Sequence, residues 1–231
     1  FGISEDAIRR DLRALAAVGL CRRVYGGALP LSPGTKPVSH RLGTGVDRKR
    51  ALARAAMSMI EPGSFIFLDN GSTSLIVAEE LPRDADLVVA TSSIEIASAL
   101  LARGDIHIHM VGGTIDTVIG GAIDGMALEA ISRLNIDVCF LGVCTLSAEG
   151  GVSALDGPDA TFKRALVARS RATLALATNE KIGEHAPHRI ADLDAIEHVI
   201  IEHDAPDAGT ETLRAAGAGI LRAAPGSAQP A

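Results

Sequence analysis

The stretch Ser64-Phe65-Ile66-Phe67-Leu68-Asp69-Asn70-Gly71-Ser72-Thr73 decides the predicted fold, because an apolar run ends there in a polar turn. Residues 64–68 are β-rich, and residues 74–81 follow with helical spacing. The same order continues with strands expected at 87–90, 106–111, 138–143, 172–177 and 199–202, and helices at 94–102, 122–134 and 159–170. Strands separated by helices of about ten residues predict βαβ units. We therefore expect an α/β fold with a mainly parallel sheet flanked by helices.

The composition agrees with a covered parallel sheet. Hydrophobic residues make up 47% of the 231 residues, aromatic residues only 3%, and Trp is absent, so the core must be aliphatic. No apolar run is long enough for a membrane span, and no signal peptide is visible. Cys21, Cys139 and Cys144 show no Cys-x-x-Cys spacing, which predicts a reduced, cytoplasmic compartment. We expect Cys139 and Cys144 to fill the core.

Small polar residues follow successive predicted strands. In an open α/β sheet, ligands bind at the carboxyl ends of strands, where helix N-termini supply free N–H groups. A phosphate suits the Gly-Ser-Thr turn after the first strand, whereas Asp69 suits sugar hydroxyls. Each loop alone is better explained by capping and turns, but several at one edge favour a shared pocket. The predicted ligand-binding residues here are Asp69, Gly71, Ser72, Thr73, Thr91, Ser92, Ser93, Gly112 and Gly113.

A second polar cluster lies at 156–164. Asp156, Asp159 and Lys163 could act as acid–base groups, or could be a helix cap and a solvated helix. A lysine at this edge could hold a phosphate as a point charge, so Asp159 and Lys163 are predicted ligand contacts. Lys181, after the next strand, is another predicted contact, with a plain surface lysine as the alternative.

The first thirty residues have a different character. Ser4 is a suitable helix N-cap, Ile8, Leu12 and Leu15 share one face, and Gly19 suits the helix end. Residues 20–25 alternate as a short strand, and Gly26-Gly27 turns the chain. A short arginine-bearing helix and a basic hairpin are typical of a winged helix-turn-helix, which needs a further helix before Gly2. The predicted DNA contacts are Ser4, Arg9, Arg10, Arg13, Arg22 and Arg23.

The charge distribution supports a division into two parts. Residues 1–50 carry ten Lys or Arg and four acids, whereas residues 51–231 carry twelve and twenty-four. A basic end on an acidic body indicates nucleic-acid contact through that end. We expect a partial DNA-binding domain at 1–30, a Pro- and Gly-rich linker at 31–46, a helix at 49–59 that opens an effector-binding domain at 47–222, and a disordered tail at 223–231.

The motifs together resemble the DeoR family of bacterial sugar-metabolism repressors. The first part is similar to the family's recognition helix and wing, and the body to its sensor domain across nearly the whole remaining chain. The matching stretches are Asp69-x-Gly71-Ser72-Thr73, Thr91-Ser92-Ser93-x-x-x-Ala97, Val111-Gly112-Gly113, Asp137-x-x-Phe140-Leu141-Gly142, Gly150-Gly151-Val152 and Lys163-Arg164. The resemblance implies a fold like that of ribose-5-phosphate isomerase and a homo-oligomer that binds operator DNA and a phosphorylated sugar.

The chain departs from the family pattern at a few positions. The family's threonine in the recognition helix is Ala7, and its acid ahead of Lys163 is Asp159 rather than glutamate. Asp116 stands where the family has an arginine, and Thr178 where it commonly has aspartate. An acid at 116 would repel a second phosphate of the effector.

Two other functions stay open at this stage. One is a sugar-phosphate isomerase of the same fold, with Asp156, Asp159 and Lys163 as its base and electrophile. The other is a ligand-binding module without DNA binding. His107 and His109 alternate on one predicted strand and are better explained by a half-exposed strand than by a metal pair. No cofactor and no metal are expected.

Overall fold

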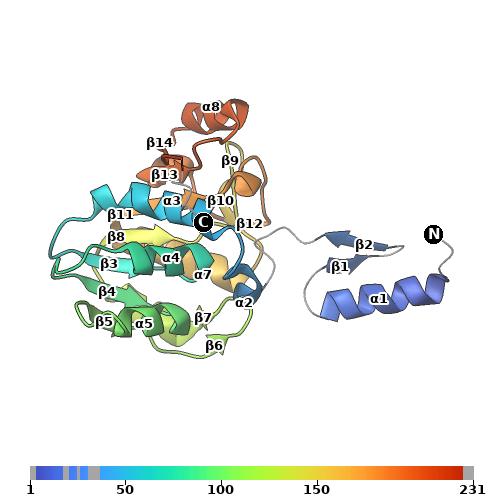
Figure 1. Ribbon diagram of the computed structural model, residues 1–231, viewed down its shortest axis with the longest axis horizontal. Helices are drawn as coiled ribbons and strands as arrows, with labels where there is room; N and C mark the ends of the chain where they lie inside the picture. Colours follow the sequence, from blue (N-terminus) through green and yellow to red (C-terminus); the bar gives the residue numbers. More distant parts are fainter. Residues whose placement is uncertain (1–3, 18–20, 25–26, 31–36, 226–231) are drawn as a thin grey trace, which may run out of the picture.

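A seven-stranded, entirely parallel sheet forms the centre of the body (Figure 1). The computed structural model describes residues 4–17, 21–24, 27–30 and 37–225. The strand order β14-β13-β11-β8-β3-β4-β5 confirms the mainly parallel α/β fold predicted from the sequence. The strands are β3 (Phe65–Leu68), β4 (Val88–Thr91), β5 (His107–Met110), β8 (Ile136–Leu141), β11 (Ser170–Ala177), β13 (His198–Ile201) and β14 (Ile220–Arg222).

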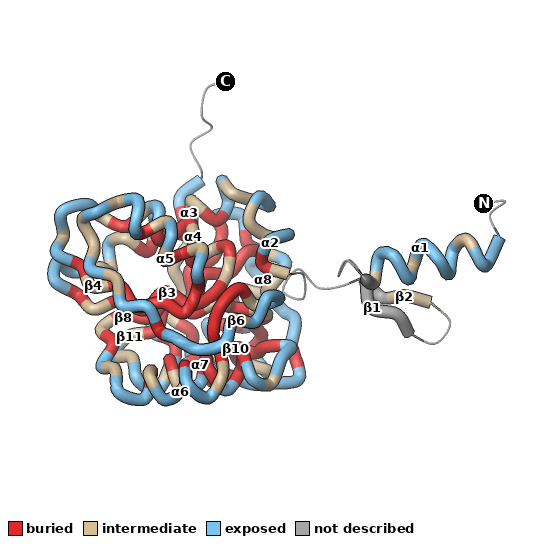
Figure 2. The backbone as a smooth tube through the Cα atoms, turned by 90° about the horizontal axis from the view of Figure 1, so that it is seen from below, coloured by how far each residue is buried: buried red, intermediate tan, exposed pale blue. Residues whose placement is uncertain are grey.

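Helices cover both faces of this sheet, and the alternation within each strand follows from that. Ile66 and Leu68 of β3 belong to one buried cluster, while Phe67 between them belongs to the other. The first cluster includes residues of α3 (Val46–Ala56), α4 (Ser72–Glu80) and α5 (Ile94–Leu101), and the second includes residues of α6 (Gly125–Ser132) and α7 (Gly157–Arg169). Figure 2 shows the buried residues concentrated along the central strands. The apolar runs are therefore strands buried on both sides.

Several elements were not predicted. A short antiparallel hairpin joins β6 (Ile115–Asp116) to β7 (Gly121–Ala122), where the sequence predicted the start of a helix at residue 122. A second sheet of β9 (Thr145–Ser147), β10 (Gly151–Ala154) and β12 (His188–Ala191) follows β8, and α8 (Asp207–Ala215) precedes β14. Short 3-10 turns occupy Met57–Met59, Asn179–Lys181 and Leu193–Ala195.

The expected linker and tail both contain ordered structure. α2 (Val38–Arg41) lies within the segment expected to be a linker, and α3 begins at Val46 rather than at residue 49. The predicted tail is wrong at Ala223, which is buried and donates its N–H to the carbonyl of Ile201, because β14 extends the sheet to this point. Residues 226–231 lie outside the described residues.

The N-terminal part consists of α1 (Glu5–Ala17) and a hairpin of β1 (Cys21–Val24) and β2 (Gly27–Pro30). Ser4 accepts the N–H of Ala7 at 3.3 Å, as its predicted role as N-cap requires. Gly19 and Gly26, at the predicted helix end and turn, lie outside the described residues. Ile8 and Leu15 remain exposed on α1, at 46% and 40%. None of the described helices has the length and apolar character needed to span a bilayer.

Candidate functional site

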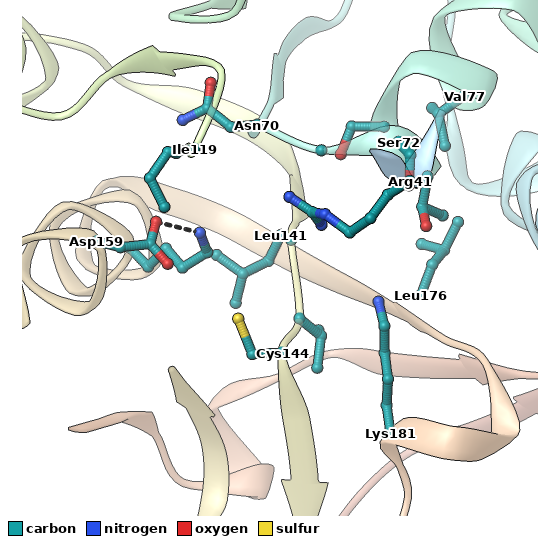
Figure 3. Close-up of a pocket in the computed structure, with 16 residues that line it drawn as sticks. Arg41, Asn70, Ser72, Val77, Ile119, Leu141, Cys144, Asp159, Leu176 and Lys181 are labelled. Atoms are coloured by element: carbon teal, nitrogen blue, oxygen red, sulfur yellow. Dashed lines mark hydrogen bonds and ion pairs between the residues drawn. The ribbon is translucent and has the colours of Figure 1, made fainter. Parts of the chain in front are cut away.

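A pocket opens at the carboxyl ends of β3, β8 and β11, which is where the sequence predicts a ligand (Figure 3). Its wall combines the turn after β3, the start of α4, the segment after β8, one face of α7, and single residues from α2 and the β6–β7 hairpin. The lining residues are Arg41, Asn70, Gly71, Ser72, Thr73, Ser74, Val77, Ile119, Leu141, Gly142, Val143, Cys144, Asp159, Lys163, Leu176 and Lys181.

The N-terminus of α4 supplies free donors to this pocket. Gly71 is the N-cap and has φ 137°, a backbone conformation that side chains rarely adopt. Because glycine has no side chain, no cap hydrogen bond occupies the first turn, and the first intrahelical bond runs from Leu75 N–H to the Gly71 carbonyl. The N–H groups of Ser72, Thr73 and Ser74 therefore have no acceptor within the helix. An anion can accept hydrogen bonds from these N–H groups, and the positive end of the helix dipole favours its binding there.

Lys163 is held by two buried carboxylates. Its Nζ lies 2.5 Å from Asp159 Oδ1 and 3.2 Å from Asp69 Oδ2, and all three side chains are buried. Burial alone would lower the pKa of Lys163, but the two carboxylates outweigh it and raise that pKa. Burial raises the pKa of Asp69, while Lys163 and the N–H groups of Gly142 and Asn70 act against it. Lys163 is therefore charged, and its charge is compensated within the protein.

Arg41 and Lys181 differ from Lys163 because, within the described part of the chain, neither forms an ion pair with a carboxylate. Burial lowers the pKa of Lys181 to about 8, and the charges of Arg41 and Lys49 act in the same direction. Burial also lowers the pKa of Arg41. Figure 3 shows both side chains reaching toward the same region of the pocket. The pocket thus has uncompensated positive charge, which suits an anionic ligand.

Lys49 contacts two of the residues that line the pocket, Arg41 and Ser72. Its buried ammonium donates to the Arg41 carbonyl and to Ser72 Oγ, both at 2.9 Å. Burial, with the neighbouring charge of Arg41, lowers the pKa of Lys49 to about 8. Lys49 therefore joins α2 and the start of α4 to α3.

The structure brings six of the sequence-predicted ligand residues together and leaves the other six outside the lining. Gly71, Ser72, Thr73, Asp159, Lys163 and Lys181 line the pocket. Asp69 does not, because both of its oxygens are used internally by Lys163 and by backbone N–H groups. It orients Lys163 rather than facing the sugar hydroxyls that the sequence suggested.

Residues 91–93 are also turned inward. Thr91 donates to the Leu68 carbonyl at 2.8 Å, Ser92 donates to Asn70 Oδ1 at 3.0 Å, and Ser93 caps α5 by accepting the N–H of Ile96. Of these residues, Ser92 affects the pocket indirectly, since its hydrogen bond holds the amide of the pocket-lining Asn70 in place. The alternative reading of helix caps and turns therefore describes this loop better.

The loop after β5 lies away from the pocket lining. Gly112 and Gly113 are exposed, and Gly113, with φ 133°, packs close to Asp124. Asp116 is exposed and accepts the N–H groups of Val118 and Ile119 at 2.8 and 2.9 Å. The carboxylate of Asp116 therefore stabilises the β6–β7 turn, instead of facing an effector phosphate as the resemblance suggested.

The acid–base reading of 156–163 is also changed. Asp156 is the N-cap of α7 and accepts the N–H of Asp159 at 2.9 Å. The carboxylate of Asp159 forms its ion pair with Lys163.

Cys139 is buried as predicted, but Cys144 is only partly buried and lines the pocket, because β8 ends at Leu141 and the chain turns there.

Arg41, Asn70 and Ile119 line the pocket but were not predicted from the sequence. Arg41 lies in a Pro- and Gly-rich segment without apolar periodicity, and Ile119 in a hairpin whose strands have two residues each. The available signal for Asn70 was its place in the turn between Asp69 and Gly71. The Nδ2 atom of Asn70 and the Nε atom of Arg41 are both buried and find no acceptor among the described residues.

The predicted DNA contacts lie on α1 and β1. Ser4, Arg9, Arg10 and Arg13 are exposed. Arg9 pairs with Glu5 at 3.1 Å, and Arg10 lies 4.0 Å from Asp11. Arg22 and Arg23 fall within β1, and their side chains lie outside the description. Over the residues that are described, no three His, Cys, Asp or Glu side chains gather in a way that could hold a metal ion.

Comparisons with known proteins match both parts of the chain. Residues 44–203 match the DeoR C terminal sensor domain, and residues 1–33 match the DeoR-like helix-turn-helix domain. The glycerol-3-phosphate regulon repressor of Escherichia coli K12 is 30% identical over 89% of this chain and 82% of its own length. The HTH-type transcriptional regulator GlpR of Haloferax volcanii is 29% identical over 95% and 87%.

Among solved structures, ribose 5-phosphate isomerase A from Neisseria gonorrhoeae is similar with a TM-score of 0.42 and 17% identity, over 61% of this chain and 55% of that one. The two family matches together span the basic helix and hairpin and most of the body, including every pocket-lining residue except Arg41. The chain therefore belongs to the DeoR family.

Proposed function

We propose that this protein is a transcriptional repressor of carbohydrate metabolism genes, controlled by a phosphorylated sugar or a related small anionic metabolite bound in the pocket. The single observation that carries the proposal is the meeting of uncompensated positive charge, from Arg41 and Lys181, with the uncapped N-terminus of α4. Three free N–H groups and two cations at one place suit a phosphate. The glycerol-3-phosphate regulon repressor among the relatives supports the same interpretation.

The N-terminal part supplies the DNA contacts in this proposal. α1 presents Arg9, Arg10 and Arg13 to solvent, and the acidic body repels a duplex, so binding comes from the basic end. Ser4 and the β1 arginines, Arg22 and Arg23, complete the proposed DNA contacts. Arg9 is paired with Glu5 at 3.1 Å and Arg10 with Asp11 at 4.0 Å on their own helix.

Control by the effector requires two arrangements of the protein. We propose a homo-oligomer in which the ligand favours the arrangement whose two recognition helices no longer match the operator spacing. The ligand can shift this equilibrium only by its differential affinity for the two arrangements. In this proposal the charged pocket wall supplies the differential contacts.

The isomerase alternative has less support. The acid–base groups expected for an isomerase were Asp156, Asp159 and Lys163, but Asp159 and Lys163 form a buried ion pair and Asp156 caps α7. The two relatives compared above are regulators by name. Incubation with ribose 5-phosphate, followed by measurement of ribulose 5-phosphate, tests for residual isomerase activity.

The proposal is tested by screening phosphorylated sugars against the full chain by thermal shift, with each dephosphorylated sugar as its matched control. A specific ligand raises the melting temperature by mass action. The DNA sequence that the protein selects from a random pool then serves in an anisotropy assay. We expect a phosphorylated sugar to stabilise the protein and to release this DNA. Equal stabilisation by the dephosphorylated sugar, or no effect on DNA binding, would contradict the proposal.

A further inference from the structure

We infer that Arg41 binds the anionic group of the effector and connects pocket occupancy to the segment that leads to the DNA-binding part. This inference rests on the proposed function and goes further, because it makes Arg41 the connection between the bound anion and the segment that leads to the DNA-binding part. Arg41 is the last residue of α2, which precedes the first helix of the body, α3.

The position of the Arg41 side chain carries the first step. It lines the pocket, and its guanidinium points into the space between Lys181 and Asp159 (Figure 3). Arg41 Nη1 lies 3.9 Å from the point where a Cβ on Gly71 would be. The guanidinium therefore lies beside the N-cap of α4, where the free N–H groups begin. A phosphate placed there can contact both.

The second step is that Arg41 lacks a partner for one of its donors. Its Nε is buried and has no hydrogen-bond acceptor in the part of the chain that the structure describes. A buried donor without an acceptor is unfavourable, because its lost hydration is not replaced, and a ligand oxygen that accepts from it removes this cost. The Nδ2 of Asn70, whose residue is 5% exposed, is unpartnered in the same way and lines the same pocket. Two unsatisfied donors in one pocket indicate a ligand rich in oxygen acceptors.

The third step is the attachment of α2 to the pocket wall. The N–H of Val38 donates to the Val118 carbonyl at 3.0 Å, and Val38 packs so closely on Gly120 that a Cβ there would lie 2.5 Å from Val38 Cγ1. At the other end of α2, the Arg41 carbonyl accepts from Lys49 Nζ, which also donates to Ser72. A ligand that binds the Arg41 guanidinium therefore contacts α2 at the end where Lys49 connects α2 to α4.

The fourth step is chain continuity. β2, the last strand of the N-terminal part, ends at Pro30, and α2 begins at Val38. Only seven residues lie between them, so α2 is the first described element of the body after the wing. Coupling between the pocket and the DNA-binding part requires such a physical connection. It also requires two arrangements of the protein for which the ligand has different affinities.

The test compares Arg41→Ala, Arg41→Lys and the control Arg54→Ala in the full chain. Arg54 lies on α3, is exposed and pairs with Glu80 away from the pocket lining. Inorganic phosphate is the probe, and its affinity is measured by phosphorus NMR line broadening. We expect Arg41→Ala to weaken phosphate binding at least tenfold, Arg41→Lys to weaken it less because charge is kept without the planar fork, and Arg54→Ala to leave it unchanged.

Hydrogen exchange provides a second measurement. At saturating phosphate, the protection of the amides does not depend on the phosphate affinity. At saturating phosphate, we expect the amides of α2 to be protected in the wild type and in Arg54→Ala, but not in Arg41→Ala at equal saturation. The inference is overturned if Arg41→Ala binds phosphate as the wild type does, or if phosphate leaves the α2 amides unchanged. In both cases phosphate still binds, so the proposed function survives. A wild type that binds no phosphate overturns both.

Discussion

Replacement of Lys163 by methionine tests the buried charge cluster beneath the pocket. The substitution leaves two carboxylates, Asp69 and Asp159, that are 0% and 2% exposed, without their cation. At an effective dielectric constant of 20, charges 2.5 and 3.2 Å apart interact by about 7 and about 5 kcal/mol. The cost of burying the ions offsets part of this. Removal of one partner of a buried pair typically costs about 3–5 kcal/mol, which is the expected loss of unfolding free energy at pH 8.

The pH dependence of this loss has a definite sign. Without Lys163, burial raises the pKa of Asp69 further, so the folded protein binds a proton that the unfolded chain releases. A group with a raised folded pKa contributes stability that is lost as the pH rises through that pKa. The destabilisation by Lys163→Met should therefore be smaller at pH 5 than at pH 8.

Urea unfolding followed by circular dichroism at both pH values measures this effect. The matched control is Lys163→Met combined with Asp69→Asn and Asp159→Asn, which removes the two uncompensated carboxylates and should recover most of the stability at pH 8. A loss below about 1 kcal/mol that is equal at pH 5 and pH 8 would refute the reasoning, because such a result requires carboxylates that are hydrated or protonated in the wild type.

Three further predictions concern the ligand, the pocket wall and DNA. Phosphate affinity should fall about tenfold between pH 7 and pH 9, since Lys181 has a pKa of about 8 and loses the attracting charge above it; a flat calorimetric profile would contradict this. Gly121→Ala should destabilise the protein by about 1–3 kcal/mol in urea and weaken ligand binding, because its Cβ would lie 2.0 Å from Asn70 Oδ1; wild-type values for both would count against the assigned role of Asn70. Arg10→Ala should abolish specific DNA binding in a gel shift and leave phosphate binding intact, with Arg133→Ala, at the C-cap of α6, as the control; loss of both activities together would contradict the prediction.

The fold could be predicted from the sequence wherever a strand carries a continuous apolar run. β3, β4, β8 and β11 are mostly buried and mostly apolar, with Asp137 in β8 and Arg171 in β11 as the charged exceptions, and the predicted ranges differ from the structure by a residue or two at most ends. The β6–β7 hairpin could not be predicted, because two-residue strands have no periodicity. α2 was missed because four residues within a Pro- and Gly-rich segment resemble a linker.

The candidate site was predictable in place but not in detail. The topology of a parallel sheet brings the turn after β3, the start of α7 and the segment after β11 to one edge, which is why Gly71, Lys163 and Lys181 meet. The direction of a side chain depends on its buried neighbours. Asp69 faces Lys163 rather than a ligand because α7 places that ammonium beside it, and no spacing in the sequence records this contact. Arg41 reaches the pocket from a distant segment.

The central claim is that the edge of the sheet at α4 binds the phosphate of a small metabolite. The most direct measurement is a crystal structure of the full chain with the phosphorylated sugar that gives the largest thermal shift. The account predicts that the phosphate lies at the first turn of α4, accepts from the N–H groups of Ser72 and Thr73, and contacts Arg41 and Lys181. A sugar bound elsewhere, or one bound here with its phosphate directed to solvent, would contradict it.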